Sequence, residues 1–168
     1  SVRVGAGAED KAIKLEPGVS GGRVFAASAD GTVMALQASS GNKIWSQNVR
    51  DIYTSAEVNH AFAKDIDIIT GGVGVGDDLV LVGTAAGEIV ALFQSDGSLA
   101  WRSIVASEVL APPQVSNQLV VAQSIDGSVT GLDAFTGERR WRFNTPPPAL
   151  TLRGTSTPIL RDDVVIAG

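Results

Sequence analysis

Residues 22–45 read GRVFAASADGTVMALQASSGNKIW, and the chain repeats this phrase as DLVLVGTAAGEIVALFQSDGSLAW (78–101) and QLVVAQSIDGSVTGLDAFTGERRW (118–141). Aligned in this way, the middle glycines and the final tryptophans fall in register: Gly31, Gly87 and Gly127, and Trp45, Trp101 and Trp141. Such a regular spacing is typical of stacked supersecondary units. We expect repeat cores at 22–49, 78–105 and 118–145, and the start of a fourth repeat at 162–168.

Each phrase has two turns between three apolar or mixed runs. The first turn contains Asp30-Gly31 or Asp126-Gly127, and Asp-Gly is a strong hairpin signal because glycine accepts a positive φ. The second turn holds another in-register set of glycines, Gly41, Gly97 and Gly137. Each repeat therefore predicts a three-stranded antiparallel meander, with room for one more short strand in the connection.

The middle run of each phrase indicates how the sheets pack. Residues 33–36 and 89–93 are apolar at consecutive positions. In a sheet with one solvent-exposed face, apolar and polar residues alternate instead. The third run is more polar, as expected for an exposed edge. Sheets buried on both faces predict an all-β fold, a β-propeller with four-stranded antiparallel blades. A β-sandwich is the alternative, but it needs no matched glycines and tryptophans. We expect those tryptophans, with Gly31, Gly87 and Gly127, to be structural residues between blades.

Composition excludes several classes of function. The net charge of −5 and the pI near 4.7 argue against nucleic acid or an anionic membrane as partner. The absence of cysteine excludes disulfides and thiol chemistry. Because propellers usually have four to eight blades, we expect the 168 residues to be part of a longer protein. Open blade faces on such a piece would favour self-association.

Few residues suggest chemistry. His60 is the only histidine, and one imidazole without neighbouring ligands makes a poor metal site. Residues 71–76, GGVGVG, are similar to a phosphate-binding loop, but the next run predicts a strand instead of a helix, so we expect a flexible loop between blades. Asp77-Asp78 and Asp162-Asp163 occupy matching positions and predict turns. We predict no catalytic residue, no metal site and no cofactor.

One connection stands out from the repeat. Residues 146–158 read PPPALTLRGTSTP, and the three prolines favour a stiff, extended start. In an extended chain Leu150 and Leu152 share one face, with Arg153 on the other. Such a loop suits docking to a partner, because loops carry function and arginine is enriched in binding hot spots. From the residues alone the other interpretation, two leucines packed between blades, stays open.

Two resemblances follow from these motifs. Residues 131–141, GLDAFTGERRW, resemble the A-x-D-x-x-T-G-x-x-x-W repeat of quinoprotein-type propellers, with Gly131 departing at the first position. From about Leu15 to Gly168 the chain resembles the BamB family, periplasmic lipoproteins of the outer-membrane β-barrel assembly (BAM) machinery. The most specific match is LTLRGTSTP (150–158), which is similar to that family's Leu-x-Leu-Arg-Gly-x-Ser-x-Pro loop.

The BamB resemblance implies the N-terminal half of an eight-bladed propeller and a non-enzymatic scaffold. It implies binding to the POTRA domains of BamA through Leu150, Leu152 and Arg153, and a role in folding and inserting outer-membrane proteins, which are themselves possible partners. It also implies a lipid anchor, absent from this chain, at the periplasmic face of a Gram-negative outer membrane. Two alternatives stay open: a fragment of a quinone-dependent dehydrogenase, and a generic propeller used as a ligand-binding or sensor module.

Overall fold

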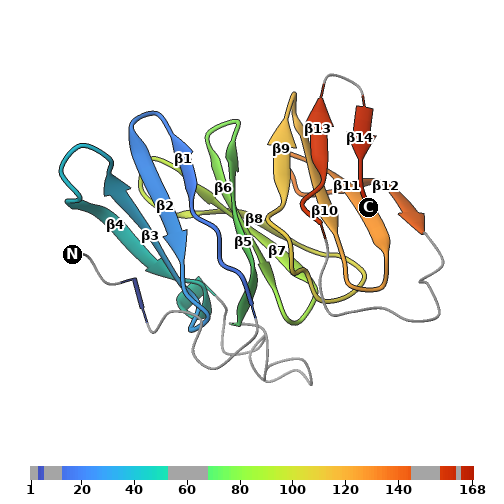
Figure 1. Ribbon diagram of the computed structural model, residues 1–168, viewed down its shortest axis with the longest axis horizontal. Helices are drawn as coiled ribbons and strands as arrows, with labels where there is room; N and C mark the ends of the chain where they lie inside the picture. Colours follow the sequence, from blue (N-terminus) through green and yellow to red (C-terminus); the bar gives the residue numbers. More distant parts are fainter. Residues whose placement is uncertain (1–3, 6–12, 53–67, 145–155, 162–163) are drawn as a thin grey trace.

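The computed structural model describes residues 4–5, 13–52, 68–144, 156–161 and 164–168, which form three four-stranded antiparallel sheets and one two-stranded sheet (Figure 1). In each large sheet the strands lie in chain order. The first comprises β1 (Gly18–Ser20), β2 (Arg23–Ala27), β3 (Thr32–Gln37) and β4 (Lys43–Asn48), and is followed by the short 3-10 helix η1 (Val49–Ile52). The second comprises β5 (Ile69–Gly76), β6 (Leu79–Thr84), β7 (Glu88–Phe93) and β8 (Leu99–Ile104).

The third sheet comprises β9 (Gln114–Ser116), β10 (Leu119–Gln123), β11 (Ser128–Asp133) and β12 (Arg139–Asn144). The two-stranded sheet pairs β13 (Ile159–Arg161) with β14 (Val164–Ile166). The first strands of successive sheets contact one another, β1 with β5, β5 with β9 and β9 with β13. The sheets thus stack face to face along the chain (Figure 1). This arrangement confirms the predicted all-β, propeller-type fold, and the expected additional strand is the first one of each sheet.

The second sheet explains why its strands are apolar at consecutive positions. Its side chains at 80, 82, 90 and 92 enter a core shared with the first sheet, where Phe25 and Trp45 have ring centroids 6.0 Å apart. Its side chains at 79, 81, 89 and 91 enter a second core shared with the third sheet. Both faces are therefore dry, because side chains alternate across a strand. The last strands, β4, β8 and β12, are the most exposed of the large sheets.

The turns have the backbone that their residues predict. The hairpins between the first two strands have positive φ at both central residues: Gly21-Gly22, Asp77-Asp78 and Asn117-Gln118. Two positive φ values are typical of a type I′ turn, whose twist matches that of the strands. The turn predicted at Asp77-Asp78 is confirmed, and Asp162-Asp163 lies outside the described residues.

The loop predicted at residues 71–76 is wrong, because these residues belong to strand β5. Their glycines allow neighbouring backbones to come close. A Cβ on Gly72 would lie 2.8 Å from the backbone nitrogen of Glu16, and one on Gly74 would collide with the carbonyl oxygen of Pro113. Glycine in a strand often marks such a close approach of another backbone. Among the described helices, none is long and apolar enough to cross a membrane.

Candidate protein-binding surface

The predicted binding residues Leu150, Leu152 and Arg153 lie outside the described residues. The described residues on either side of this connection show where the chain leaves one sheet and enters the next. It leaves the last strand of the third sheet at Asn144 and returns at Ser156, ahead of β13. The Ser156 hydroxyl donates a 2.6 Å hydrogen bond to the Gly168 carbonyl. The Gln123 side-chain amide donates to the same oxygen at 3.0 Å, so the returning end is linked to the third sheet.

The first two tryptophans lie at the contact between one sheet and the next, here called a seam. Trp45 donates from Nε1 to the Gln94 carbonyl at 3.0 Å, and Trp101 donates to the Ala134 carbonyl at 2.7 Å. Gln94 and Ala134 occupy the same repeat position, directly after the third strand of the following sheet. Both indoles are buried, with 8% and 7% of their surface exposed. The two seams therefore use the same contact.

The glycines at the indoles belong to the second set. Gly97 lies against Trp45, and a Cβ on it would be 2.6 Å from the indole Cε3. By contrast, the glycines assigned between blades from the sequence close hairpin turns of their own sheets, with positive φ at Gly31, Gly87 and Gly127. Sequence reasoning did not assign the second set to a seam. The signal in the sequence was that these glycines recur at one repeat position, as the tryptophans do.

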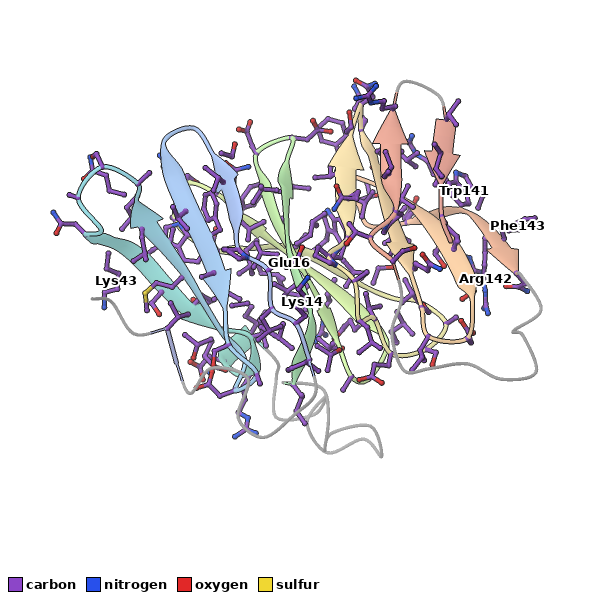
Figure 2. All side chains as sticks on the ribbon, viewed as in Figure 1. Lys14, Glu16, Lys43, Trp141, Arg142 and Phe143 are labelled. Atoms are coloured by element: carbon purple, nitrogen blue, oxygen red, sulfur yellow. The ribbon has the colours of Figure 1, made fainter. Side chains whose placement is uncertain are left out.

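Trp141 lies in different surroundings from the other two tryptophans. Its indole packs on Gly131 of its own sheet and is 37% exposed. No residue in the described part of the chain accepts a hydrogen bond from its Nε1. Phe143, two residues further along β12, is 64% exposed, and Figure 2 shows both rings at the same outer region of the sheet. With Asp162-Asp163 aligned on Asp77-Asp78, the positions that match Ala134 and Gly137 fall after residue 168 of the given sequence.

Two of the three arginines of β12 form ion pairs with aspartates of their own sheet. Arg140 forms a 2.6 Å ion pair with Asp133, and Arg142 approaches Asp126 at 3.5 Å. The Arg140 hydrogen bond, followed by those from the backbone N–H groups of Thr136 and Phe135, lowers the pKa of Asp133 to about 2. Asp133 thus organises the turn of the Asp-x-x-Thr-Gly motif.

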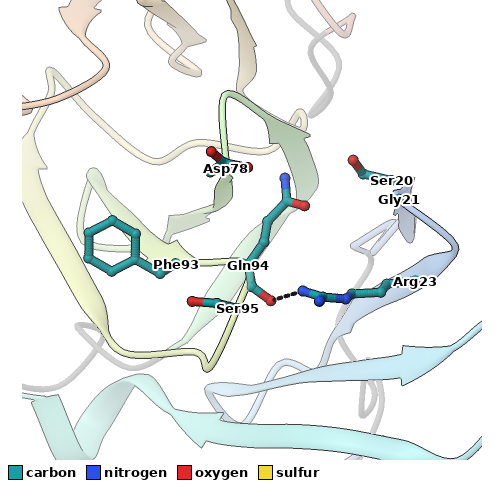
Figure 3. A pocket seen from close by; sticks show the side chains of 7 residues that line it. All are labelled: Ser20, Gly21, Arg23, Asp78, Phe93, Gln94 and Ser95. Carbon is teal, nitrogen blue, oxygen red and sulfur yellow. Dashed lines mark hydrogen bonds between the residues drawn. The ribbon is translucent and has the colours of Figure 1, made fainter.

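A surface hollow of about 570 Å³ lies between the first and second sheets (Figure 3). Arg23 and Phe93 line it from either side of Gln94. The Arg23 guanidinium donates from Nη1 to the Gln94 carbonyl at 2.8 Å, and this oxygen also accepts from Trp45. Sequence analysis did not identify the hollow, although both lining residues depart from the repeat.

Metal-ligand types do not gather in the described residues, where no group of three or more His, Cys, Asp or Glu side chains could hold an ion. His60 lies outside this part of the chain.

The family model described as Outer membrane protein assembly factor BamB matches residues 3–67 and 57–168. The chain belongs to the BamB family. The BamB protein of Yersinia pestis is 33% identical over 168 residues, which cover 100% of this chain and 42% of that protein. The chain therefore spans less than half the length of that relative.

The solved structures agree with the BamB assignment. The crystal structure of BamB from Moraxella catarrhalis superposes with a TM-score of 0.73 at 28% identity, over 92% of this chain and 41% of that one. A quinohemoprotein alcohol dehydrogenase from Pseudomonas putida gives a TM-score of 0.63 at 28% identity, over 86% of this chain and 22% of the enzyme. The likeness to the enzyme covers a smaller share of both chains.

Proposed function

We infer that this chain is part of a non-enzymatic scaffold subunit of the outer-membrane protein assembly machinery. In this role it binds the POTRA domains of BamA and aids the folding and insertion of β-barrel proteins, which are its further partners. The site of action is the periplasmic face of the outer membrane of a Gram-negative bacterium, with a lipid anchor in the full-length protein. The observation that supports this most strongly is the BamB family match across the chain.

Leu150, Leu152 and Arg153 are the proposed contact residues. Their connection starts at the exposed strand β12 and ends at Ser156 beside the third sheet, so its ends are fixed on the stacked sheets. A loop held at both ends loses less conformational entropy on binding than a free peptide does. The composition of this loop agrees only in part with that of interface hot spots, because arginine is enriched in hot spots and leucine is not. The arginine should therefore carry the larger share of the binding energy.

The test measures the affinity of the protein for purified BamA POTRA domains by calorimetry. Leu150→Ala, Leu152→Ala and Arg153→Ala are each expected to weaken binding by about tenfold or more, as hot-spot residues do. Leu99→Ala is the matched control, because Leu99 lies on β8 and is 38% exposed. Affinities of all three loop variants within about 0.5 kcal/mol of the unaltered protein would refute the site assignment.

The quinone-dependent dehydrogenase is the competing proposal, favoured by the likeness to the alcohol dehydrogenase. It predicts calcium-dependent quinone uptake by the full-length protein. The scaffold proposal predicts no uptake, and detection of a quinone bound stoichiometrically by absorption spectroscopy would replace it. A generic ligand-binding or sensor propeller predicts instead that the 150–153 loop is dispensable for every interaction.

Self-association of the 168-residue chain is a further part of the proposal. Trp141 and Phe143 present an exposed aromatic surface on the outer part of the third sheet (Figure 2). Exposed apolar surface of this kind favours contact with a second copy. Light scattering should show a concentration-dependent dimer, weakened by Phe143→Ser. A monomer at all concentrations tested would contradict it.

A further inference from the structure

The residues that line the hollow between the first and second sheets have counterparts at the same positions of the other repeats. Arg23 occupies the position that holds Leu79 in the second repeat and Leu119 in the third. In all three sheets this residue starts the second strand and pairs with the end of the third strand: Arg23 with Gln37, Leu79 with Phe93, and Leu119 with Asp133. Arg23 is therefore charged at a position where the second and third repeats have leucine.

Phe93 also differs from its counterparts in the other repeats, but here an apolar residue stands where they have polar ones. The other repeats have a polar residue at this position, Gln37 or Asp133, whereas Phe93 is aromatic and 43% exposed. The two departures occur in different repeats, yet the stacking of the first two sheets brings both onto one hollow (Figure 3). A charged residue in place of an apolar one, and an exposed ring in place of a polar group, suit binding better than packing.

Arg23 is held in a position from which it can bind a ligand. One guanidinium nitrogen, Nη1, is fixed by the Gln94 carbonyl at 2.8 Å. Among the described residues, no carboxylate forms an ion pair with Arg23. The Arg23 residue is half-buried and lines the hollow. A guanidinium fixed in this way is suited to bind a carboxylate through charge-assisted hydrogen bonds.

The negative charge of Asp78 at the rim of the hollow limits which ligands could bind beside Arg23. Asp78 also lines the hollow and is exposed, and hydroxyl groups are supplied by Ser20 and Ser95. A carboxylate at the rim disfavours a compact anion such as phosphate, which it would repel. An extended polypeptide can offset this repulsion, which phosphate cannot, because its backbone N–H groups can donate to Asp78 while an acidic side chain reaches Arg23.

We propose that the hollow lined by Arg23, Phe93, Gln94 and Asp78 binds an extended peptide segment that carries an acidic and an aromatic side chain on the same face. The acidic group pairs with the Arg23 guanidinium, and the aromatic ring packs on Phe93. This interaction is separate from the 150–153 loop, which leaves the third sheet, whereas the hollow lies between the first and second.

The experiment uses the 168-residue chain and fluorescein-labelled, amidated threonine peptides that contain one glutamate and one phenylalanine. One or three threonines separate the two residues, so that in an extended strand both side chains share a face. Binding is followed by fluorescence polarisation. We expect saturable binding of at least one peptide, weakened tenfold or more when its glutamate is replaced by glutamine. This peptide change leaves the protein unaltered, so the result does not depend on the folding of a variant.

Two variants place the residue of another repeat at the site, which favours an intact fold. Arg23→Leu should weaken binding tenfold or more and abolish the preference for glutamate over glutamine. Phe93→Gln should weaken binding about fivefold and abolish the preference for phenylalanine over serine in the peptide. Phe135→Gln is the control, because Phe135 is 72% exposed and occupies the turn after the third strand of the next sheet; it should stay within twofold.

Three results would overturn the proposal. The first is the absence of saturable binding, and the second is that neither Arg23→Leu nor the glutamine peptide changes the affinity by more than twofold. The third is displacement of the peptide by millimolar inorganic phosphate, which would indicate an anion site only. The assay contains no BamA, so its failure leaves the proposed loop interaction with POTRA domains unaffected. Conversely, loss of POTRA binding in the loop variants does not change the expected peptide affinity.

Discussion

Gly137 lies directly against the indole of Trp101, so that a Cβ on this glycine would be 2.5 Å from the ring atom Cε3. Gly137 also has a φ of +72°. Gly22 has the same φ of +72°, but a Cβ there would meet nothing within 4 Å. A comparison of Gly137 with Gly22 therefore separates the strain of a left-handed backbone from the steric cost of placing a side chain in the seam.

Gly137→Ala should therefore destabilise the protein more than Gly22→Ala. The left-handed conformation costs a residue with a Cβ about 1–2 kcal/mol in either case. At Gly137 the collision with the indole adds about 1–3 kcal/mol, as overpacking does. Urea unfolding followed by tryptophan fluorescence measures both. Equal losses at the two positions would show that the indole moves aside at no cost.

The tryptophans should differ in their contribution to stability. Trp101→Ala removes a buried ring and its hydrogen bond to Ala134, and should cost about 3–5 kcal/mol. Trp141→Ala removes a ring that is 37% exposed and should cost only about 1–2 kcal/mol. Chemical denaturation of the two variants compares them. A Trp141 variant as unstable as the Trp101 variant would mean that the ring of Trp141 is covered in solution.

Gly74→Ala tests the close packing of β5. The φ of Gly74 is outside the positive range, so the substitution adds volume without backbone strain. Its Cβ would collide with the Pro113 carbonyl, and the two backbones would have to separate. We expect a loss of about 1–3 kcal/mol or more, measured as a lower urea midpoint. Gly21→Ala is the contrasting case, because its φ is +54° but nothing lies within 4 Å, so it measures backbone strain without crowding. An unchanged midpoint for Gly74→Ala would contradict the packing.

The carboxylate of Asp133 should make stability depend on pH in acid. Its pKa is lowered from the ordinary 3.8 to about 2, first by the Arg140 hydrogen bond and then by those from Thr136 and Phe135. Because the pKa is lower in the folded state, the stabilisation is complete above about pH 4 and disappears as the pH falls towards 2. Asp133→Asn should lower stability at neutral pH, and the difference from the unaltered protein should shrink in acid.

NMR titration of the Asp133 carboxyl carbon checks the cause directly. Arg140→Gln removes the largest contribution, so the pKa of Asp133 should rise towards 3.8 while the two backbone hydrogen bonds hold it partly down. A native-state pKa near 3.8 in the unaltered protein would exclude the turn as a source of pH-dependent stability.

Local patterns were sufficient to predict the fold, because the signals for turns and two-sided burial are short-range. Asp30-Gly31 and Asp126-Gly127 specify hairpins, and the consecutive apolar residues 89–92 require a neighbour on each face. The glycines of β5 could not be interpreted in the same way. Glycine is suited both to loops and to strands that other backbones approach closely, and only the positions of Glu16 and Pro113 decide between the two.

The contacts at the seams could be predicted only in outline. Trp45 binds Gln94 and Trp101 binds Ala134, residues 49 and 33 positions later in the chain. These separations differ because the connections between sheets differ in length, so the partner depends on how the sheets stack. The hollow with Arg23 and Phe93 depends on stacking too, since its residues come from different repeats. The loop residues Leu150, Leu152 and Arg153 stay a prediction.

The direction of the seam contact has a consequence for the order in which the chain matures. In both seams the indole donor precedes its carbonyl acceptor in sequence. A chain that emerges N-terminus first, from a ribosome or across a membrane, presents Trp45 before Gln94. Until then a nascent sheet holds an indole N–H without its native acceptor. In these two seams, each unit is thus completed only by its successor.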